Sequence, residues 1–413
     1  HKFQLHNGDR VASLTRVGHT AHHLQVIENP DWILLVGGAN LSSCCKNALL
    51  VNIKKDQVYS AEHPDALPVP GLSRYEQSSC ICDCEIIIFG GATSEQPLND
   101  ILRLKMESFS LSGSQPFLKF STPNESIITS PTCIITPRTQ HTADCITSAG
   151  EIIIFAGGNM GSEPVADSSV YAYEVKSNKW RIIEMEIGDH DFPHCRMGHL
   201  MIIRPRDSQS SLNEEFVYIH GGMSGNEFLD DFHRLRIKRI MVENGEARLT
   251  GEWQNVRNAV PSEGSFWPVA RAGHGGAIVY SNTNVLRFFI FGGLNSSGAL
   301  NDLHYFDEGS KQWTTVTTSG NVVPSPRLDF AFTTLRLKVV NPDFTPEATE
   351  LTSTFSVSNL DDDNDDYDAH EKNPSADQGN LFVWKNYLFI QGGMNADQDI
   401  FSDAFLCCLD DVP

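Results

Sequence analysis

The chain has 413 residues, with 31 Lys and Arg against 52 Asp and Glu, which gives a formal net charge of −21. This acidic balance argues against nucleic acid as a partner, because a protein that neutralises phosphates needs clustered basic side chains. No apolar stretch exceeds the length of a strand and no charged-then-apolar leader opens the chain, so we expect neither a membrane-spanning helix nor a secretory signal.

The pair Gly-Gly occurs six times, and each time it ends a short apolar run. Each run has the length of a buried strand, and the two glycines supply the positive φ angles with which a chain leaves a strand sharply. A self-similar unit that occurs six times predicts a six-bladed, all-β propeller. In chain order, the runs are 33–38, 86–91, 152–158, 217–222, 288–293 and 387–393.

Each unit begins with Arg-x-x-His or a variant of it, in which Gln77 and Phe330 replace the histidine of the second and sixth units. After the glycines, a polar turn leads into a third strand. A tryptophan stands on the expected fourth strand of three units, at Trp180, Trp253 and Trp313. Four strands in a repeat of about 50 residues are typical of the Kelch motif. The arginines that open the units are Arg16, Arg74, Arg138, Arg196, Arg271 and Arg327.

The last unit is incomplete. Only one strand, 402–407, follows its glycines, while the segment 2–6 precedes the first arginine and has no partner in its own unit. We expect these two segments to pair, so that N- and C-terminal strands close the ring in the last blade and remove its open edges. The whole chain, 1–413, is then a single propeller. Its blades cover about 14–60, 72–120, 136–184, 194–256, 269–317 and 325–409 plus 2–6.

Two segments depart from the repeat. Residues 341–378 carry eleven acidic side chains against one lysine and few large apolar residues, which predicts an acidic disordered insert within blade six. This insert is either a solvating loop or a docking segment for a basic partner. Residues at roughly 108–136 are rich in Ser, Thr and Pro and predict a long outer loop of blade two.

The order of the strands predicts where the six arginines lie. Because neighbouring strands of a blade are antiparallel, the double-glycine turns, the links between blades and the arginines share one face, at the mouth of a central channel. Two interpretations remain open: the guanidiniums form a positive rim that binds a carboxylate-rich protein segment, or each one bonds carbonyls of its own or the next blade. The candidate protein-binding rim consists of Arg16, Arg74, Arg138, Arg196, Arg271 and Arg327.

No set of residues indicates catalysis. The sequence lacks the Gly-x-Ser-x-Gly spacing of a nucleophile elbow and the Gly-x-x-x-x-Gly-Lys-Ser/Thr phosphate loop. Its ten cysteines have neither metal-ligand nor disulfide spacing, so we expect them to be reduced. The motif histidines are expected to bond backbone groups rather than a metal. We therefore expect a non-catalytic protein with neither a cofactor nor a metal site.

The order of the motif variants is more specific than any one of them. The chain carries Arg-Val-Gly-His at 16–19, Val-Gly-Gly-Ala-Asn at 36–40 and Pro-Arg-Thr-x-His at 137–141, and closes with Gly-Gly-Met-Asn at 392–395. Between these lie Ile-His-Gly-Gly at 219–222, Asp-Asp-x-His at 230–233 and Phe-Gly-Gly-Leu-Asn-x-x-Gly-Ala-Leu at 291–300. In this order the chain resembles the Rab effector proteins with Kelch motifs over essentially its whole length.

The resemblance implies a protein that binds a GTP-bound Rab GTPase and promotes transport from endosomes to the trans-Golgi network. It implies a cytoplasmic protein that lies on endosomal membranes through a partner, without inserting into them. It supplies no catalytic residues. Two alternatives from other classes stay open: a substrate-recognition Kelch module of a cullin ubiquitin ligase, which needs a cullin-binding domain, and a Kelch-fold enzyme, which needs paired tyrosine and histidine ligands for copper.

Overall fold

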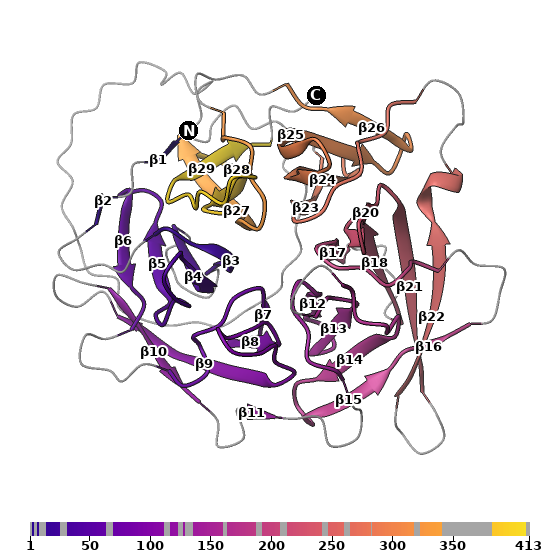
Figure 1. The fold of residues 1–413 in the computed structure, drawn as a ribbon, viewed down its shortest axis with the longest axis horizontal. Helices are drawn as coiled ribbons and strands as arrows, with labels where there is room; N and C mark the ends of the chain where they lie inside the picture. The colour runs from indigo at the N-terminus through magenta and orange to yellow at the C-terminus, as the bar shows by residue number, and fades with distance from the viewer. Residues whose placement is uncertain are drawn as a thin grey trace, which may run out of the picture.

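A computed structural model describes residues 2–3, 6–7, 14–24, 31–62, 69–110, 116–122, 127–128, 135–159, 163–186, 192–206, 213–241, 247–259, 265–281, 283–317, 323–340 and 382–409. Its strands form six blades around a central axis, as Figure 1 shows. The six-bladed, all-β propeller predicted from the double glycines is confirmed. No helix in the described part of the chain is long and apolar enough to cross a membrane.

Blades one to three each contain four antiparallel strands that lie side by side in chain order. Blade one consists of β3 (Val17–His23), β4 (Trp32–Ala39), β5 (Leu49–Asn52) and β6 (Gln57–Ser60). Blade two consists of β7 (Ser78–Cys82), β8 (Glu85–Phe89), β9 (Ile101–Ser110) and β10 (Phe117–Ser121), and β11 (Ile127–Ile128) also pairs with β9. Blade three consists of β12 (Thr142–Ile146), β13 (Glu151–Phe155), β14 (Val170–Glu174) and β15 (Lys179–Ile182).

Blades four and five follow the same order. Blade four consists of β17 (Leu200–Ile203), β18 (Glu214–His220), β21 (Phe232–Met241) and β22 (Ala247–Asn255), with β16 (Glu184–Met185) parallel to β22 at its outer edge. Its second loop holds the hairpin of β19 (Met223–Ser224) and β20 (Glu227–Phe228), and the 3-10 helix η1 (Val256–Ala259) follows β22. Blade five consists of β23 (Gly275–Tyr280), β24 (Leu286–Asn295), β25 (Gly298–Asp307) and β26 (Gln312–Thr315).

Both ends of the chain build blade six. Its strands are β27 (Ala331–Val340), β28 (Phe382–Gln391), β29 (Ala404–Cys408) and the N-terminal β1 (Lys2–Phe3). Lys2 lies opposite Phe405 in an antiparallel pair, so the predicted closure by N- and C-terminal strands is confirmed. The pairing does not extend to His6, because β2 (His6–Asn7) instead adds to β6 in parallel. The N-terminal segment therefore joins blade six to blade one.

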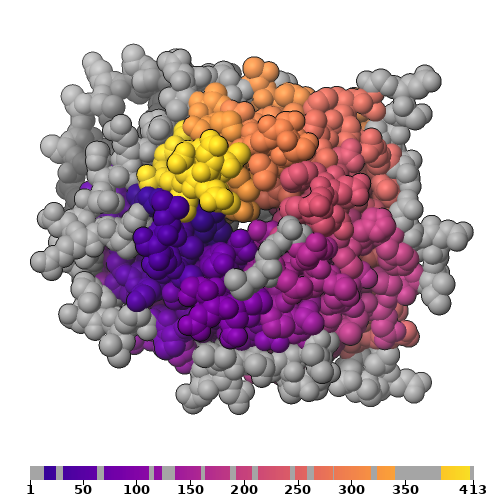
Figure 2. Space-filling view, in the orientation of Figure 1, coloured from indigo at the N-terminus to yellow at the C-terminus, as the bar shows by residue number. Residues whose placement is uncertain are grey.

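The first strand of each blade lines the axis and contacts the first strands of both neighbouring blades, including β27 with β3 across the closure. The core is correspondingly divided into six apolar layers, each between two adjacent blades, and the space-filling view of Figure 2 shows the blades packed closely around the axis. The three tryptophans lie on fourth strands, as predicted, and face the preceding blade. Trp180, for example, packs edge-on against Phe89, with 5.4 Å between ring centroids.

The predictions for the two segments that depart from the repeat differ in what the structure says of them. The predicted outer loop of blade two is partly wrong, because β9 runs to Ser110 and β10 lies antiparallel to it from Phe117 to Ser121. The end of β9 and the whole of β10, both with apolar side chains, thus occupy part of the segment 108–136, whose Ser, Thr and Pro content suggested a loop. The acidic segment 341–378 lies outside the described residues. The strands on either side of it pair up to Val340 and Phe382, at the end of blade six opposite its double glycine.

Candidate functional site

The double-glycine turns follow the second strand of each blade and hydrogen-bond that blade to the next one. In every blade, the second residue of the turn donates its backbone N–H to the carbonyl of the next blade's motif arginine, at 2.8–3.0 Å. Both turn residues have positive φ, and a side chain on Gly37 would come within 2.9 Å of the Arg74 carbonyl. Glycine suits both the conformation and the close approach. In blade three the two turn residues are Ala156 and Gly157, and Ala156 adopts a φ of 51°. We call the face that carries these turns and the links between blades the turn face.

The six motif arginines are buried below this face. Their side chains are 0–2% exposed, and each guanidinium donates to the carbonyl of the first turn residue of its own blade at 2.8–3.0 Å. In five blades an aspartate nine or ten residues after the second turn residue also accepts from the guanidinium. These pairs are Arg74–Asp100, Arg138–Asp167, Arg196–Asp231, Arg271–Asp302 and Arg327–Asp403.

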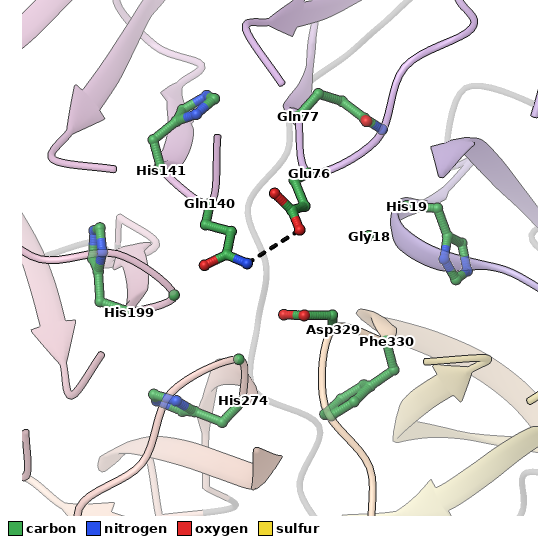
Figure 3. Close-up of a pocket in the computed structure, with 12 residues that line it drawn as sticks. Gly18, His19, Glu76, Gln77, Gln140, His141, His199, His274, Asp329 and Phe330 are labelled. Atoms are coloured by element: carbon green, nitrogen blue, oxygen red, sulfur yellow. Dashed lines mark hydrogen bonds between the residues drawn. The ribbon is translucent and has the colours of Figure 1, made fainter. Parts of the chain in front are cut away.

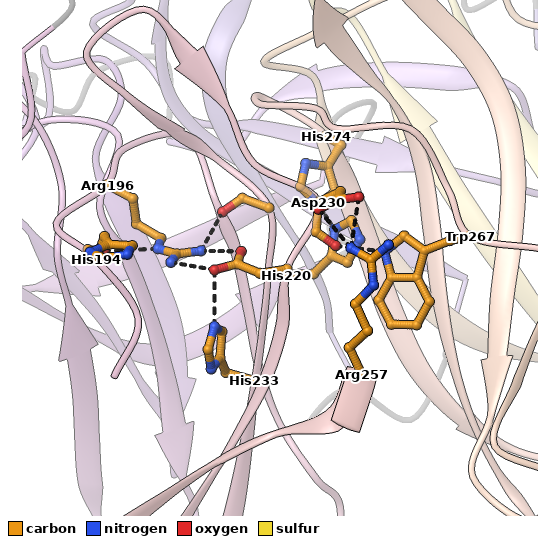
Figure 4. Close-up of polar contacts among 10 residues, drawn as sticks. His194, Arg196, His220, Asp230, His233, Arg257, Trp267 and His274 are labelled. Atoms are coloured by element: carbon orange, nitrogen blue, oxygen red, sulfur yellow. Dashed lines mark hydrogen bonds and ion pairs between the residues drawn. The ribbon is translucent and has the colours of Figure 1, made fainter. Parts of the chain in front are cut away.

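Figure 4 shows the blade-four example. Arg196 forms two hydrogen bonds with Asp231, at 2.6 and 2.7 Å, and also donates to the carbonyls of His194 and Gly221. Burial raises the pKa of Asp231, but the hydrogen bonds from Arg196 and His233 outweigh burial and hold it well below its usual range. The aspartate is therefore ionised, and the guanidinium of Arg196 is fully used inside the blade.

This geometry corrects the expectation of an exposed positive rim. Arg16, Arg74, Arg138, Arg196, Arg271 and Arg327 present almost no surface to a partner. Apart from Nε of Arg16, their donors bond carbonyls and carboxylates of the propeller itself. The alternative, that the arginines bond carbonyls, describes what the structure shows. The arginines instead hold the turn of each blade in place.

The residue two positions after each arginine forms a closed ring around the axis. Each of these six residues has a positive φ of 48–64° and donates its N–H to the carbonyl of its counterpart in the preceding blade, at 2.7–3.1 Å. The sixth member accepts the N–H of the first, so the circle is complete. The members are Gly18, Glu76, Gln140, Gly198, Gly273 and Asp329, and we call them the axial ring.

The motif histidines link each blade to the one before it. His141 bonds Ser78, His199 bonds Thr142 and His274 bonds His220, while His19 bonds Gln391 across the closure. Their partners are side chains, so the expectation that they bond backbone groups is corrected. In blade two, Gln77 reaches the Val36 carbonyl instead.

Burial, followed by the charge of the nearby motif arginine, lowers the pKa of His19 and of His141 to about 3, so these rings are neutral at physiological pH. Among the described residues no group of three or more His, Cys, Asp or Glu side chains could hold a metal ion.

A cavity of about 140 Å³ lies at the axial ring, and Figure 3 shows it from along the axis. Three members of the axial ring are glycines, so among the ring members Glu76, Gln140 and Asp329 extend side chains into the cavity. Gln140 donates to Glu76 at 3.1 Å. Burial and the charge of Glu76 raise the pKa of Asp329 to about 7. The axis therefore carries carboxyl groups rather than the guanidiniums that the sequence suggested.

Sequence reasoning missed the aspartates that pair with the arginines, although a signal was present. An aspartate stands nine or ten residues after the second turn residue in five units, and a charge that recurs at a fixed offset from a recurring opposite charge indicates an internal pair. The axial ring left no such signal, because its six positions hold four residue types.

The comparisons with known proteins agree with this geometry. The family model described as the KLHDC2/KLHL20/DRC7 Kelch-repeats domain matches residues 18–240 and 140–342. The chain belongs to the Kelch-repeat family. Its similarity to the Rab effector proteins with Kelch motifs is also shown. It is 27% identical over 221 residues to the Rab9 effector protein with kelch motifs of Xenopus laevis, covering 52% of each chain.

The human protein of the same name is 28% identical over 221 residues, which are 52% of this chain and 51% of that protein. Tip elongation aberrant protein 3 of Schizosaccharomyces pombe is 28% identical over 199 residues, which are 44% of this chain and 16% of that protein. The alignments thus span about half the length of the Rab9 effector relatives.

Proposed function

We propose that this Kelch propeller is a non-catalytic Rab GTPase effector that binds the GTP-bound form and acts in transport from endosomes to the trans-Golgi network. Two relatives named as Rab9 effector proteins support the class of partner. The cytoplasmic location and the recruitment to endosomal membranes through the GTPase belong to the same proposal. The Kelch family and the absence of a catalytic motif in the sequence support a binding role rather than an enzymatic one.

One observation favours the turn face as the docking surface. Of the large apolar side chains that are exposed in the described residues, five lie on this face. Leu41 is in the loop between β4 and β5, and the others stand two to five residues before a motif arginine, on the links into blades four, five and six. These four are Phe192, Phe266, Val269 and Val323. Exposed apolar side chains grouped on neighbouring loops are typical of protein-interaction surfaces.

The opposite face supplies a matched control. Met241, which ends β21, is 65% exposed and Val269 is 52% exposed, so both side chains tolerate a polar replacement without loss of core packing. The experiment is a pull-down with purified Rab GTPases loaded with a non-hydrolysable GTP analogue or with GDP.

We expect capture of at least one GTP-loaded Rab, loss of that capture in Val269→Asp with Val323→Asp, and retention of it in Met241→Asp. Capture that persists in Val269→Asp with Val323→Asp and is lost in Met241→Asp would indicate that the Rab docks on the opposite face. Absence of any nucleotide-dependent capture by the wild type would contradict the proposed function itself.

A further inference from the structure

Blade one breaks the pattern of buried ion pairs. In the other five blades an aspartate stands nine or ten residues after the second turn residue and neutralises the motif arginine. Blade one has Asn47 at this position. The Arg16 guanidinium donates at 2.9 Å to the carbonyls of Gly37 and Asn47, but no carboxylate among the described residues forms an ion pair with it.

The Arg16 side chain also lacks a hydrogen bond that its counterparts make. In the other five blades the Nε atom donates to a carbonyl two or three residues upstream, whereas Nε of Arg16 is buried without a partner. The carbonyl two residues upstream, that of Leu14, accepts from Gln391 instead. Arg16 is therefore a fully buried cation with an unsatisfied donor, a condition that costs stability unless an anion is supplied.

Glu62 does not supply that anion. It is 8% exposed and its charge interacts with Arg16, but it lies beyond ion-pair distance and one of its carboxyl oxygens has no hydrogen-bond partner. Burial raises the pKa of Glu62, which favours its neutral form. Burial likewise lowers the pKa of Arg16. The raised pKa of Glu62 and the lowered pKa of Arg16 both indicate that these buried charges lack adequate compensating partners.

A cavity of about 260 Å³ adjoins Arg16, and the loop between β4 and β5 forms its walls. Its lining includes Lys46, which is exposed and forms no ion pair with a described residue, and Asn47, whose side chain makes no hydrogen bond there. Arg16 and the half-buried Asn47 both line this cavity. Leu41, which is 82% exposed, follows Asn40 of the cavity lining on the same loop.

We propose that this cavity binds a carboxylate, supplied by an aspartate or glutamate of a protein partner, which takes the place that an aspartate of the chain itself occupies in the other five blades. The guanidinium of Arg16 and the ammonium of Lys46 are its two cationic contacts. Planar, bidentate recognition by arginine favours a carboxylate, as the pairs in the other blades show. The inference does not depend on the partner being a Rab GTPase.

The decisive variant is Asn47→Asp, which gives blade one the aspartate of the other blades. Thermal melting of the wild type, Asn47→Asp and Asn47→Ala is measured in acetate, phosphate or chloride at equal ionic strength. Chloride and the variants control for general salt effects. We expect acetate to raise the melting temperature of the wild type and of Asn47→Ala. We expect Asn47→Asp to melt about 2 °C or more above the wild type in chloride and to lose the response to acetate.

A second arm uses an acetylated, amidated Leu-Asp-Asp peptide against its Leu-Asn-Asn counterpart. Stabilisation of the wild type by the acidic peptide alone, absent in Asn47→Asp, supports a partner's side chain as the source of the carboxylate. Equal responses of the wild type and Asn47→Asp to acetate would overturn the site. Stabilisation by phosphate but not by acetate or the acidic peptide would overturn the assignment of a carboxylate.

Discussion

Replacement of Arg196 by alanine tests the structural role of the buried arginines. The change removes two hydrogen bonds to Asp231, at 2.6 and 2.7 Å, and one each to the carbonyls of His194 and Gly221, both at 3.0 Å. Breaking a buried ion pair by removal of one partner costs about 3–5 kcal/mol. Because Asp231 is 25% exposed and keeps its bond to His233, water can solvate part of the abandoned charge. We therefore expect a loss near about 3 kcal/mol in the free energy of unfolding.

The neighbouring aspartate provides the control. Asp230, which precedes Asp231 in the sequence, pairs with Arg257 at 3.1 Å (Figure 4), and the side chains of Arg257 and Asp230 are 52% and 39% exposed. An exposed pair contributes less than about 1 kcal/mol, and the contact of Arg257 with the Trp267 ring adds about 0.5–1 kcal/mol, so Arg257→Ala should lose much less stability than Arg196→Ala.

Urea denaturation followed by tryptophan fluorescence measures both variants, since Trp180, Trp253 and Trp313 are buried between blades. Equal free energies of unfolding for Arg196→Ala and Arg257→Ala would refute the assignment of a structural role to the buried arginines.

Three further predictions concern closure and pH. Deletion of residues 1–8 removes β1 and β2, so we expect a lower melting temperature or aggregation through the edge of blade six; unchanged melting would show that these pairs contribute little. The pKa of His141 is depressed to about 3, so the neutral ring stabilises the fold above about pH 6.5, and this stabilisation is lost as the pH falls. As the pH falls from about 7 to 5, His141→Gln should therefore gain stability relative to the wild type. Glutamine is a suitable replacement because blade two has Gln77 at this position. The pKa of Asp329 is raised to about 7, so the wild type loses stability as the pH rises from about 4 to 7. The urea midpoint of Asp329→Asn, relative to that of the wild type, should therefore rise from about pH 5 to pH 8. A difference between the two midpoints that does not change with pH would contradict this prediction.

The sequence allowed much of the fold to be predicted because its signals are local and repeated. Double glycines mark the ends of second strands, and tryptophans mark fourth strands, since each must fit the same close contact in several blades. The role of the motif arginines was harder to predict. A residue that recurs in every unit is equally compatible with an exposed rim and with an internal bond, and only its burial in three dimensions decides between them.

The exceptions were hardest to predict. Asn47 differs from an aspartate by one amide group, and it gains meaning only when the Arg–Asp pairs of the other blades are known. Likewise, β2 is two residues long and adds to blade one in parallel, which no alternation of polar and apolar residues could show. The axial ring depends on positive φ at residues as different as Gly18, Gln140 and Asp329, because the bonds that fix it are made by the backbone.

The most direct test of the central claim is an equilibrium titration of the purified chain with Rab9, loaded either with a non-hydrolysable GTP analogue or with GDP. Rab9 is the GTPase in the names of the relatives. We expect saturable binding to the GTP-analogue form and binding at least about tenfold weaker to the GDP form, a difference of about 1.4 kcal/mol. Equal affinity for the two forms, or no binding to either, would contradict the account of this propeller as an effector of that GTPase.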